Sequence, residues 1–276
     1  TVVEVATPAC AASGKSGGFL ALDWCDGGPM AALARRSFEL HSQLGREFGD
    51  KTGYRTMETL SVVATEARHD LGAYAKVDSP DWLSDHCAIH SQLGNTSNTA
   101  QVHPELLTKT LLDEALAGGA KLVTGRVEDI RHDGTRVHGV CVDGVTIDAD
   151  AVVVAMGPWS TLATKWLPLP PIMGEKGASI VLQPSAPVSA HALFGEFLDA
   201  QGGRHGPEVF PRPDGSVYLC GAPDHEELPL DPLSIAPSDA AIATLLTIAG
   251  TLSSTLKSAT LARAQACYRP IVHDGL

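Results

Sequence analysis

The spacing of apolar residues predicts strands and helices in alternation along the first half of the chain. Thr1–Val5 is a β-branched run that is typical of a buried strand. Residues 30–48 place apolar side chains at helical spacing, and residues 106–116 do so again. The second of these helices is preceded by Pro104 and followed by Gly118-Gly119, which favour a helix start and a helix end. Such an alternation is typical of an α/β fold.

Further strands and one more helix are predicted around a proline-rich stretch. Prolines crowd residues 167–171 and mark a crossing between two domains. Asp133-Gly134 and Asp143-Gly144 are turn signals of the kind that separate the strands of a meander. The predicted strands cover 57–63, 121–124, 136–142, 146–155, 179–182 and 216–220, and the predicted helix covers 238–256.

Composition argues against several classes of function. The net charge of −12 argues against a general surface for nucleic acid or anionic membrane. The six cysteines are scattered and form no CxxC pair, so we expect reduced thiols in a reducing compartment. No uninterrupted apolar stretch approaches the roughly 20 residues of a membrane-spanning helix. His86 and His90 have a spacing that could bind zinc on a helix, but no further ligand pair accompanies them, so we expect no metal.

Both ends of the sequence have an unusual composition for the ends of a complete protein. The chain starts at Thr1, directly inside an apolar run, and residues 268–276 end it without a polar tail. The start lacks the basic or Arg/Ser-rich segment of a targeting peptide. We therefore expect that both ends have been cut from a longer protein.

Glu4 and the glycine-serine loop behind it form the first group of residues with a candidate chemistry. A carboxylate at the carboxyl end of the second strand of a dinucleotide fold accepts the hydroxyls of an adenosine ribose. A solvated strand terminus is the alternative interpretation. Residues 13–18 offer backbone N–H groups, two hydroxyls and a cation, which are groups that suit a pyrophosphate. A flexible turn is the alternative interpretation of this loop.

The second group lies at residues 148–160. Its apolar run predicts a buried strand that leads directly into Gly157. Glycine at that point permits a close approach of the backbone to a ligand and a sharp exit from a sheet. The alternative is a core strand that ends in a Gly-Pro turn, with Trp159 filling the core.

Together these segments resemble the family of FAD-dependent oxidoreductases that includes D-amino-acid oxidase, glycine oxidase and sarcosine oxidase. The resemblance covers nearly the whole chain, in order, although His103 stands where the family usually has an acid. The sequence of residues 10–22 is most similar to that of a eukaryotic branch of oxidoreductases, some of which are linked to endosomal trafficking. The matching segments are Val2–Glu4, Ala12–Ala21, Gln101–Glu105, Gly125–Ile130, Ala155–Trp159, Phe210–Tyr218 and Arg269–Gly275.

The resemblance implies FAD as the cofactor and a set of residues that contact it. It identifies no catalytic residue. Lys15 is a candidate for stabilising the reduced flavin, and Lys176, Arg212 and Tyr218 are candidates for holding a substrate carboxylate. Each of these four is alternatively a surface or structural residue. The implied cofactor-binding residues are Glu4, Ser13, Gly14, Lys15, Ser16, Gly17, Gly18, Val127, Gly157, Trp159 and Arg269.

The architecture implied by the resemblance is an α/β (α+β) fold in which a Rossmann-like FAD-binding domain is interleaved with an antiparallel-sheet substrate domain. The glycine-rich G-x-G-x-x-G turn would lie before Thr1, and the segment that caps the flavin would lie after Leu276. We therefore expect this chain to retain FAD weakly and to be inactive on its own. The expected FAD-binding parts are 1–52, 100–164 and 265–276, and the expected substrate parts are 53–99 and 165–264.

The implied function is an FAD-dependent oxidase or dehydrogenase that acts on the C–N bond of a small amine or amino acid. In such enzymes flavin N5 takes a hydride from the carbon beside the amine. We expect a cytoplasmic protein. The link to trafficking suggests that it also associates with endosomes. The alternative is a flavoprotein-derived, non-catalytic trafficking or scaffold protein. A nicotinamide dehydrogenase would share Glu4 but would not explain residues 13–18 or the Arg269 segment.

Overall fold

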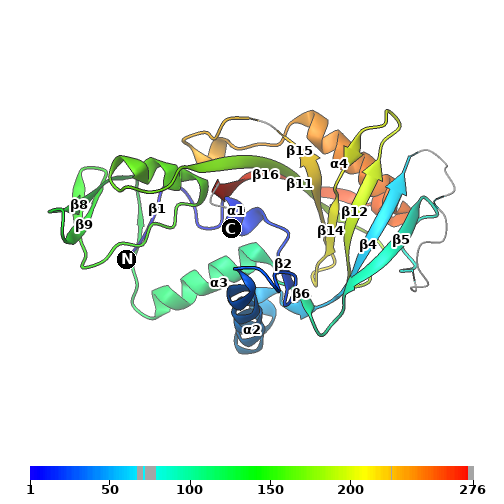
Figure 1. The fold of residues 1–276 in the computed structure, drawn as a ribbon, viewed down its shortest axis with the longest axis horizontal. Coiled ribbons are helices and arrows are strands. Elements are labelled where there is room, and N and C mark those ends of the chain that lie inside the picture. The colour runs from blue at the N-terminus through cyan, green and yellow to red at the C-terminus, as the bar shows by residue number, and fades with distance from the viewer. Residues whose placement is uncertain (67–70, 72–78, 225, 273–276) are drawn as a thin grey trace.

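The computed structural model describes residues 1–66, 71, 79–224 and 226–272. Figure 1 shows the small sheets of residues 2–4 with 122–124 and of residues 127–148 at one end of the long axis, the small sheet of residues 19–21, 55–56 and 99–101 near the middle, and a large sheet at the other end. The strands of the small sheets are β1 (Val2–Glu4), β7 (Leu122–Thr124), β8 (Val127–His132), β9 (Val137–Val142), β10 (Val145–Asp148), β2 (Phe19–Ala21), β3 (Arg55–Thr56) and β6 (Thr99–Gln101).

The large sheet dominates the described part of the chain, with its strands in the order β16-β11-β15-β14-β12-β4-β5 and β13 paired to β12. Neighbouring strands within this sheet are antiparallel, except that β4 and β12 are parallel. The chain leaves the sheet after β4 and returns to it before β12. The strands are β4 (Glu58–Thr65), β5 (Cys87–Gly94), β11 (Ile172–Gln183), β12 (His191–Leu198), β13 (Arg204–His205), β14 (Glu208–Pro211), β15 (Val217–Pro223) and β16 (Thr260–Val272).

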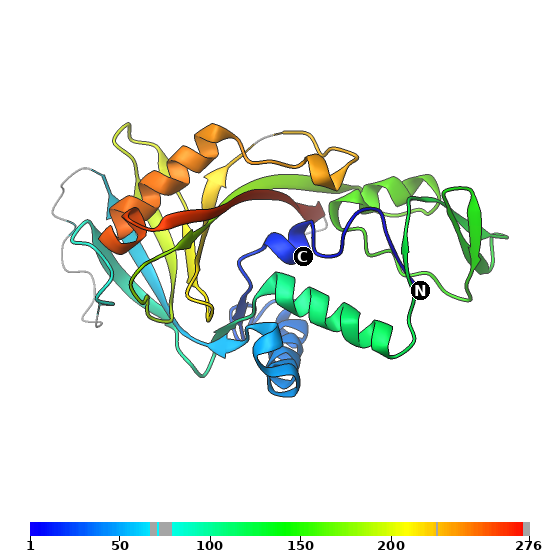
Figure 2. The ribbon, with the colours of Figure 1, turned by 180° about the vertical axis from the view of Figure 1, so that it is seen from behind.

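The helices lie on both sides of the strands. Figure 2 shows α4 over the outer side of the large sheet, while α1 lies between β16 and α3 on the other side. None of the described helices is long and apolar enough to cross a bilayer. The helices are α1 (Ala12–Lys15), α2 (Ala31–Phe48), α3 (Pro104–Ala117), α4 (Asp239–Leu252) and α5 (Ser254–Lys257), with 3-10 turns at Gly49–Thr52, Gly157–Lys165 and Pro232–Ser234.

The α/β fold class and two of the predicted helices, α2 and α3, are confirmed. The predicted helix 238–256 is interrupted at Ser253, whose hydroxyl accepts the Leu256 N–H and so starts a separate helix. The structure neither requires nor excludes the predicted division of the chain into interleaved domains, which stays a prediction.

The predicted strand 146–155 is wrong for most of its length, because β10 ends at Asp148. Residues 151–156 belong to no strand. Val152 and Val154 pack against the small β8–β9–β10 cluster, whereas Val153 is 87% exposed. Residues 151–156 alternate between exposed and half-buried, and no strand among the described residues forms a ladder with them. The prediction of a buried strand is therefore wrong for this segment.

α4 covers one face of the large sheet, and the physical reason is its apolar stripe. Ala241, Leu245, Ile248 and Leu252 recur at helical spacing and are all buried against the sheet. Ser238 caps the start of the helix, because its hydroxyl accepts the Ala241 N–H at 3.2 Å. Burial of this stripe fixes which face of the sheet is left for other contacts.

A buried ion pair joins the large sheet to the start of α4. Lys176 on β11 places Nζ 3.1 Å from Asp224 and 2.7 Å from Glu226, and its side chain is 1% exposed. Asp224 also accepts the backbone N–H of Ser238 at 3.0 Å. The charge on Lys176 is therefore neutralised by carboxylates and is used in holding β11, β15 and α4 together.

We predict that Lys176→Met lowers the free energy of unfolding by about 3 kcal/mol, because it leaves the buried Asp224 carboxylate without a cation. Lys165→Met is the matched control, since Lys165 is exposed and forms no ion pair in the described residues. Urea denaturation of both variants measures the difference. Equal stability of the two variants would contradict a role of the ion pair in the fold.

Candidate cofactor and substrate site

The segment 13–18 is held in place by side chains from three separate elements. Thr108 of α3 donates its hydroxyl to the Ser13 carbonyl at 3.0 Å, and Gln265 of β16 donates to the Lys15 carbonyl at 3.1 Å. Arg212, in the β14–β15 hairpin, donates to the Ser16 carbonyl at 3.4 Å. The segment is therefore an anchored loop and not a flexible turn.

The expectation of exposed N–H groups holds only in part. Residues 12–15 form the single turn of α1, and the N–H groups of Gly14, Lys15 and Ser16 donate to carbonyls of Ala11 and Ala12. These three groups are occupied and do not point to a ligand. Lys15 donates Nζ to the Ala266 carbonyl at 3.1 Å, which leaves its other two ammonium hydrogens for other acceptors.

A first pocket, the Glu4 pocket, lies where β1 ends. It has a volume of about 140 Å³ and brings together Glu4, Val127 and Trp159, which the sequence placed in one site. Its other walls include Val3 and Val5, so it is apolar apart from the carboxylate and Arg126. The Glu4 carboxylate accepts the Ala6 N–H at 3.0 Å through one oxygen, which orients the side chain.

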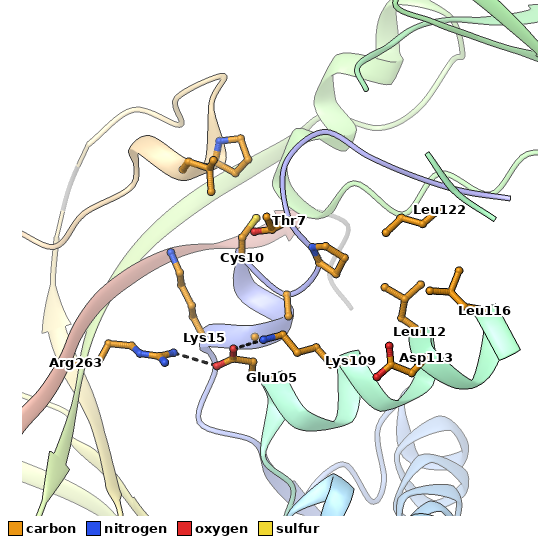
Figure 3. A pocket seen from close by; sticks show the side chains of 15 residues that line it. Thr7, Cys10, Lys15, Glu105, Lys109, Leu112, Asp113, Leu116, Leu122 and Arg263 are labelled. Carbon is orange, nitrogen blue, oxygen red and sulfur yellow. Dashed lines mark hydrogen bonds and ion pairs between the residues drawn. The ribbon is translucent and has the colours of Figure 1, made fainter. Parts of the chain in front are cut away.

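A larger pocket, the α3 pocket, lies between residues 7–15 and α3 and has a volume of about 570 Å³ (Figure 3). Glu105 lies between two cations there, 2.6 Å from Lys109 and 3.0 Å from Arg263. These pairs hold the pKa of Glu105 below its ordinary value, first through the Lys109 hydrogen bond. With Lys15 on the opposite wall, cations outnumber the carboxylates that line the pocket.

A third pocket, the sheet pocket, opens on the other side of α1 and has a volume of about 380 Å³. The loop contributes Ser16 and Gly17, and the large sheet contributes Tyr218 and Arg269. The loop lies so close to the sheet that a Cβ at Gly17 would come within 2.4 Å of the Phe210 ring. The loop, the large sheet and the Arg269 guanidinium therefore meet in one cavity.

Strand register explains why the sheet pocket is polar while the opposite face of the sheet is apolar. Glu208 pairs with Cys220, Cys220 with Ser179, and Ser179 with Gln265 across four adjacent strands. Because side chains alternate between faces, residues two positions away from these share their face. The residues between them, such as Ile180 and Leu219, face α4 and are fully buried.

The sheet pocket contains charges that differ in how firmly they are paired. Arg269 contacts Glu175 at 3.4 Å, and both side chains are more than half exposed. An exposed pair of this kind contributes little to stability, so Arg269 can exchange its partner at small cost. Lys176, one of the candidates for holding a substrate carboxylate, also lines this pocket, but its charge is engaged by Asp224 and Glu226.

Arg212 and Tyr218, the other two candidates for that role, pack against each other. The Arg212 guanidinium lies 5.2 Å from the centre of the Tyr218 ring and contacts His103 at 3.3 Å. Burial lowers the pKa of Arg212 and raises the pKa of Tyr218 well above its ordinary value, so the phenol stays protonated. Arg212 thus supports the loop, whereas Tyr218 lines the sheet pocket.

Gly157, His86 and His90 line none of the three pockets. Gly157 has φ of +54°, a backbone conformation that favours glycine, and a Cβ there would meet no protein atom within 4 Å, so its predicted contact with FAD stays a prediction. His90 lies on strand β5 and not on a helix, so the helical zinc spacing with His86 does not exist. No cluster of three metal-ligating side chains occurs among the described residues. Residues 273–275 of the Arg269 segment lie outside the described residues.

Sequence reasoning missed Glu175, Glu208 and Gln265, all of which contribute to this region. Glu208 lies two positions before Phe210 in a strand, so the two-residue alternation alone would have placed both on one face. Which face carries the pocket could not be read from the alternation, because it depends on the pairing with strands far away in the sequence.

We predict that Gly18→Ala destabilises the loop strongly. A Cβ there would lie 2.1 Å from the Val102 carbonyl oxygen, and φ is +83°. Gly134→Ala is the matched control, with φ of +93° and nothing within 4 Å. We expect a loss of about 1 kcal/mol for the control and about 3 kcal/mol or more for Gly18→Ala. If urea denaturation shows a similar loss of unfolding free energy for both variants, the close contact at Gly18 does not destabilise the Gly18→Ala variant and the prediction is wrong.

Comparisons with known proteins agree with this arrangement. The family model described as "FAD dependent oxidoreductase" matches residues 1–276. "Putative oxidoreductase C1F5.03c" of Schizosaccharomyces pombe is 27% identical over 292 residues, which cover 98% of this chain and 75% of that protein. Glycine oxidase from Bacillus cereus has a similar fold, with a TM-score of 0.76 at 20% identity over 97% of this chain and 77% of that one.

A further solved structure, iminodiacetate oxidase from Chelativorans, gives a TM-score of 0.70 at 19% identity, covering 99% of this chain and 77% of that chain. Nothing in these comparisons supports the alternative of a non-catalytic trafficking protein. The expected resemblance is therefore confirmed, and the chain belongs to the family of FAD-dependent oxidoreductases that includes glycine oxidase.

Proposed function

We propose that the chain binds FAD along residues 3–18 and uses it to oxidise the C–N bond of a small amino acid. The three pockets support this proposal, since they follow the segment in order. The Glu4 pocket adjoins β1, the α3 pocket adjoins residues 7–15, and the sheet pocket adjoins Ser16 and Gly17. The names of the similar structures, glycine oxidase and iminodiacetate oxidase, support the same class of substrate.

The residues of the pockets fit FAD in their chemistry. The Glu4 carboxylate can accept ribose hydroxyls, and the apolar walls with Val127 and Trp159 suit an adenine. Lys15 can donate to a pyrophosphate, and Gly17 leaves the loop without a side chain beside Tyr218. The occupied N–H groups of α1 limit the phosphate contacts that this segment itself can offer.

When bound, FAD supplies an acceptor for the hydride of the carbon beside the amine. The task of the chain is then to hold the substrate in the sheet pocket. The observation that carries the proposal is the shared position of Arg269 with the loop residues Ser16 and Gly17 in one cavity. Arg269 can exchange Glu175 for a substrate carboxylate, to which a guanidinium binds with two parallel hydrogen bonds.

We further propose the interleaved division stated above, with residues 1–52, 100–164 and 265–276 serving FAD and the rest serving the substrate. The position of Arg269 on β16, a strand of the large sheet that also faces the cofactor loop, supports a site formed between the two parts.

No observation supports the expectation that this chain is inactive on its own, and the proposed function predicts activity. The FAD-loaded chain should lose its flavin absorption band under anaerobic conditions when a small amino acid is added. Arg269→Gln should raise the half-saturating concentration about 30-fold, because a charge-assisted contact to the carboxylate is lost. Arg204→Gln is the control, since Arg204 forms a similar exposed ion pair with Glu196 at 3.2 Å but lies outside the pocket. No bleaching by any of the common amino acids or their N-methyl derivatives would contradict the function.

The cofactor part is tested separately with flavins of different size. Glu4→Gln should weaken FAD binding about tenfold, measured by quenching of flavin fluorescence, because the ribose loses a charged acceptor. FMN, which lacks the adenosine, should bind parent and variant equally. An equal loss for FAD and FMN, or no loss for either, would contradict the proposed role of Glu4. A titration also measures weak binding, so the expectation of poor FAD retention is tested at the same time.

A further inference from the structure

Glu208 is a charged group in the sheet pocket whose charge is not neutralised. The other charged residues that line this pocket are paired: Arg269 with Glu175, and Lys176 with Asp224 and Glu226. Among the residues that the structure describes, none forms an ion pair with Glu208, and the charge of Arg269 acts on it only from beyond ion-pair distance.

The immediate partner of Glu208 is a weak one. The thiol of Cys220, directly opposite on β15, lies 3.7 Å from one carboxylate oxygen. Burial raises the pKa of Cys220 to about 12, so this thiol stays protonated and donates to the carboxylate. A thiol is a poor substitute for a cation or for water around a carboxylate. The Glu208 carboxylate is thus half-buried in a cavity, and no nearby cation neutralises its charge.

We propose that Glu208 binds the amino group of the substrate as a cation and accepts its proton. This inference rests on the proposed function, and it narrows the substrate to a zwitterion whose carboxylate is held by Arg269. Two opposite charges on different strands of one pocket, β14 and β16, provide a separate contact for each end of such a molecule.

The proton step balances without any further reactant. One N–H bond of the substrate ammonium breaks and one O–H bond forms on Glu208, so the amine becomes neutral and the carboxylate becomes a carboxylic acid. No electrons are exchanged. A neutral amine is required next, because its lone pair assists departure of the hydride from the neighbouring carbon.

The surroundings of Glu208 favour this role. Burial raises its pKa above the ordinary value of 4.5, although Cys220 and Arg269 oppose the change. A carboxyl group with a raised pKa is a better proton acceptor near neutral pH. The titratable groups that share its pocket are Glu175 and Lys176 on β11, Tyr218 and Cys220 on β15, and Cys267 and Arg269 on β16.

The experiment compares two ligands that differ by the amino group alone. Alanine and propionate are titrated into the FAD-loaded chain under anaerobic conditions, by calorimetry and by the flavin spectrum. We expect Glu208→Gln to weaken alanine binding about 30-fold, which corresponds to loss of one charge-assisted hydrogen bond. Propionate binding should stay within threefold of the parent. The preference for alanine should also lose its dependence on pH in the range where Glu208 ionises.

The outcomes separate this inference from the proposed function. Weakened alanine binding with unchanged propionate binding supports the role of Glu208 even if no bleaching occurs, since binding requires no turnover. Equal losses for both ligands, or none, would overturn it, even if alanine bleaches the flavin of the variant. A changed FAD affinity with equal ligand effects would show a contact to the cofactor instead and would also overturn it.

Stability provides the control for folding. The folded chain holds the Glu208 proton more tightly than the unfolded chain, so this group makes stability fall as pH rises above about 4.5. Glu208→Gln removes that cost and should be at least as stable as the parent at pH 8. The difference between them should shrink as the pH is lowered to 4. A variant that is less stable than the parent at pH 8 would overturn the claim that the carboxylate is unneutralised.

Discussion

The two-residue alternation of the strands in the large sheet is the constraint on which fold and site both depend. Ile180 on β11 and Leu219 on β15 face α4 and are fully buried, while their neighbours Ser179 and Cys220 face the cofactor loop. A shift of register by one residue would place carboxylates against α4 and leucines in the pocket. Burial of the apolar face therefore also determines the polar side chains that reach the pocket.

The Lys176 ion pair connects these two faces energetically. The Lys176 and Asp224 side chains are nearly inaccessible to water, and Asp224 also accepts the backbone N–H of Ser238, the residue before α4. Breaking such a pair costs more than the pair contributes, because one charge stays buried alone. The pair accordingly favours one placement of α4 against β11. It also leaves Arg269, in its exposed pair, as the more readily available cation of the pocket.

Local features could be predicted from the sequence, while features that depend on distant pairing could not. Helices α2 and α3 follow from apolar spacing, and Pro104 with Gly118 marks the limits of α3. Residues 149–156 show the opposite case, since their apolar run says nothing about which strand lies beside them. The resemblance pointed to the cofactor loop, and the structure adds its anchors Thr108 and Gln265, which come from sites about 100 and 250 residues away.

Glu208 was missed for the same reason, and its position shows how function opposes stability in this sheet. A glutamine would fill the same space on β14 without the cost of burying a charge. The carboxylates of Asp224 and Glu226 each form an ion pair with Lys176. Among the described residues, no cation forms such a pair with Glu208. An unneutralised carboxylate beside a readily exchanged arginine is costly to the free chain, and binding of a zwitterion would remove that cost.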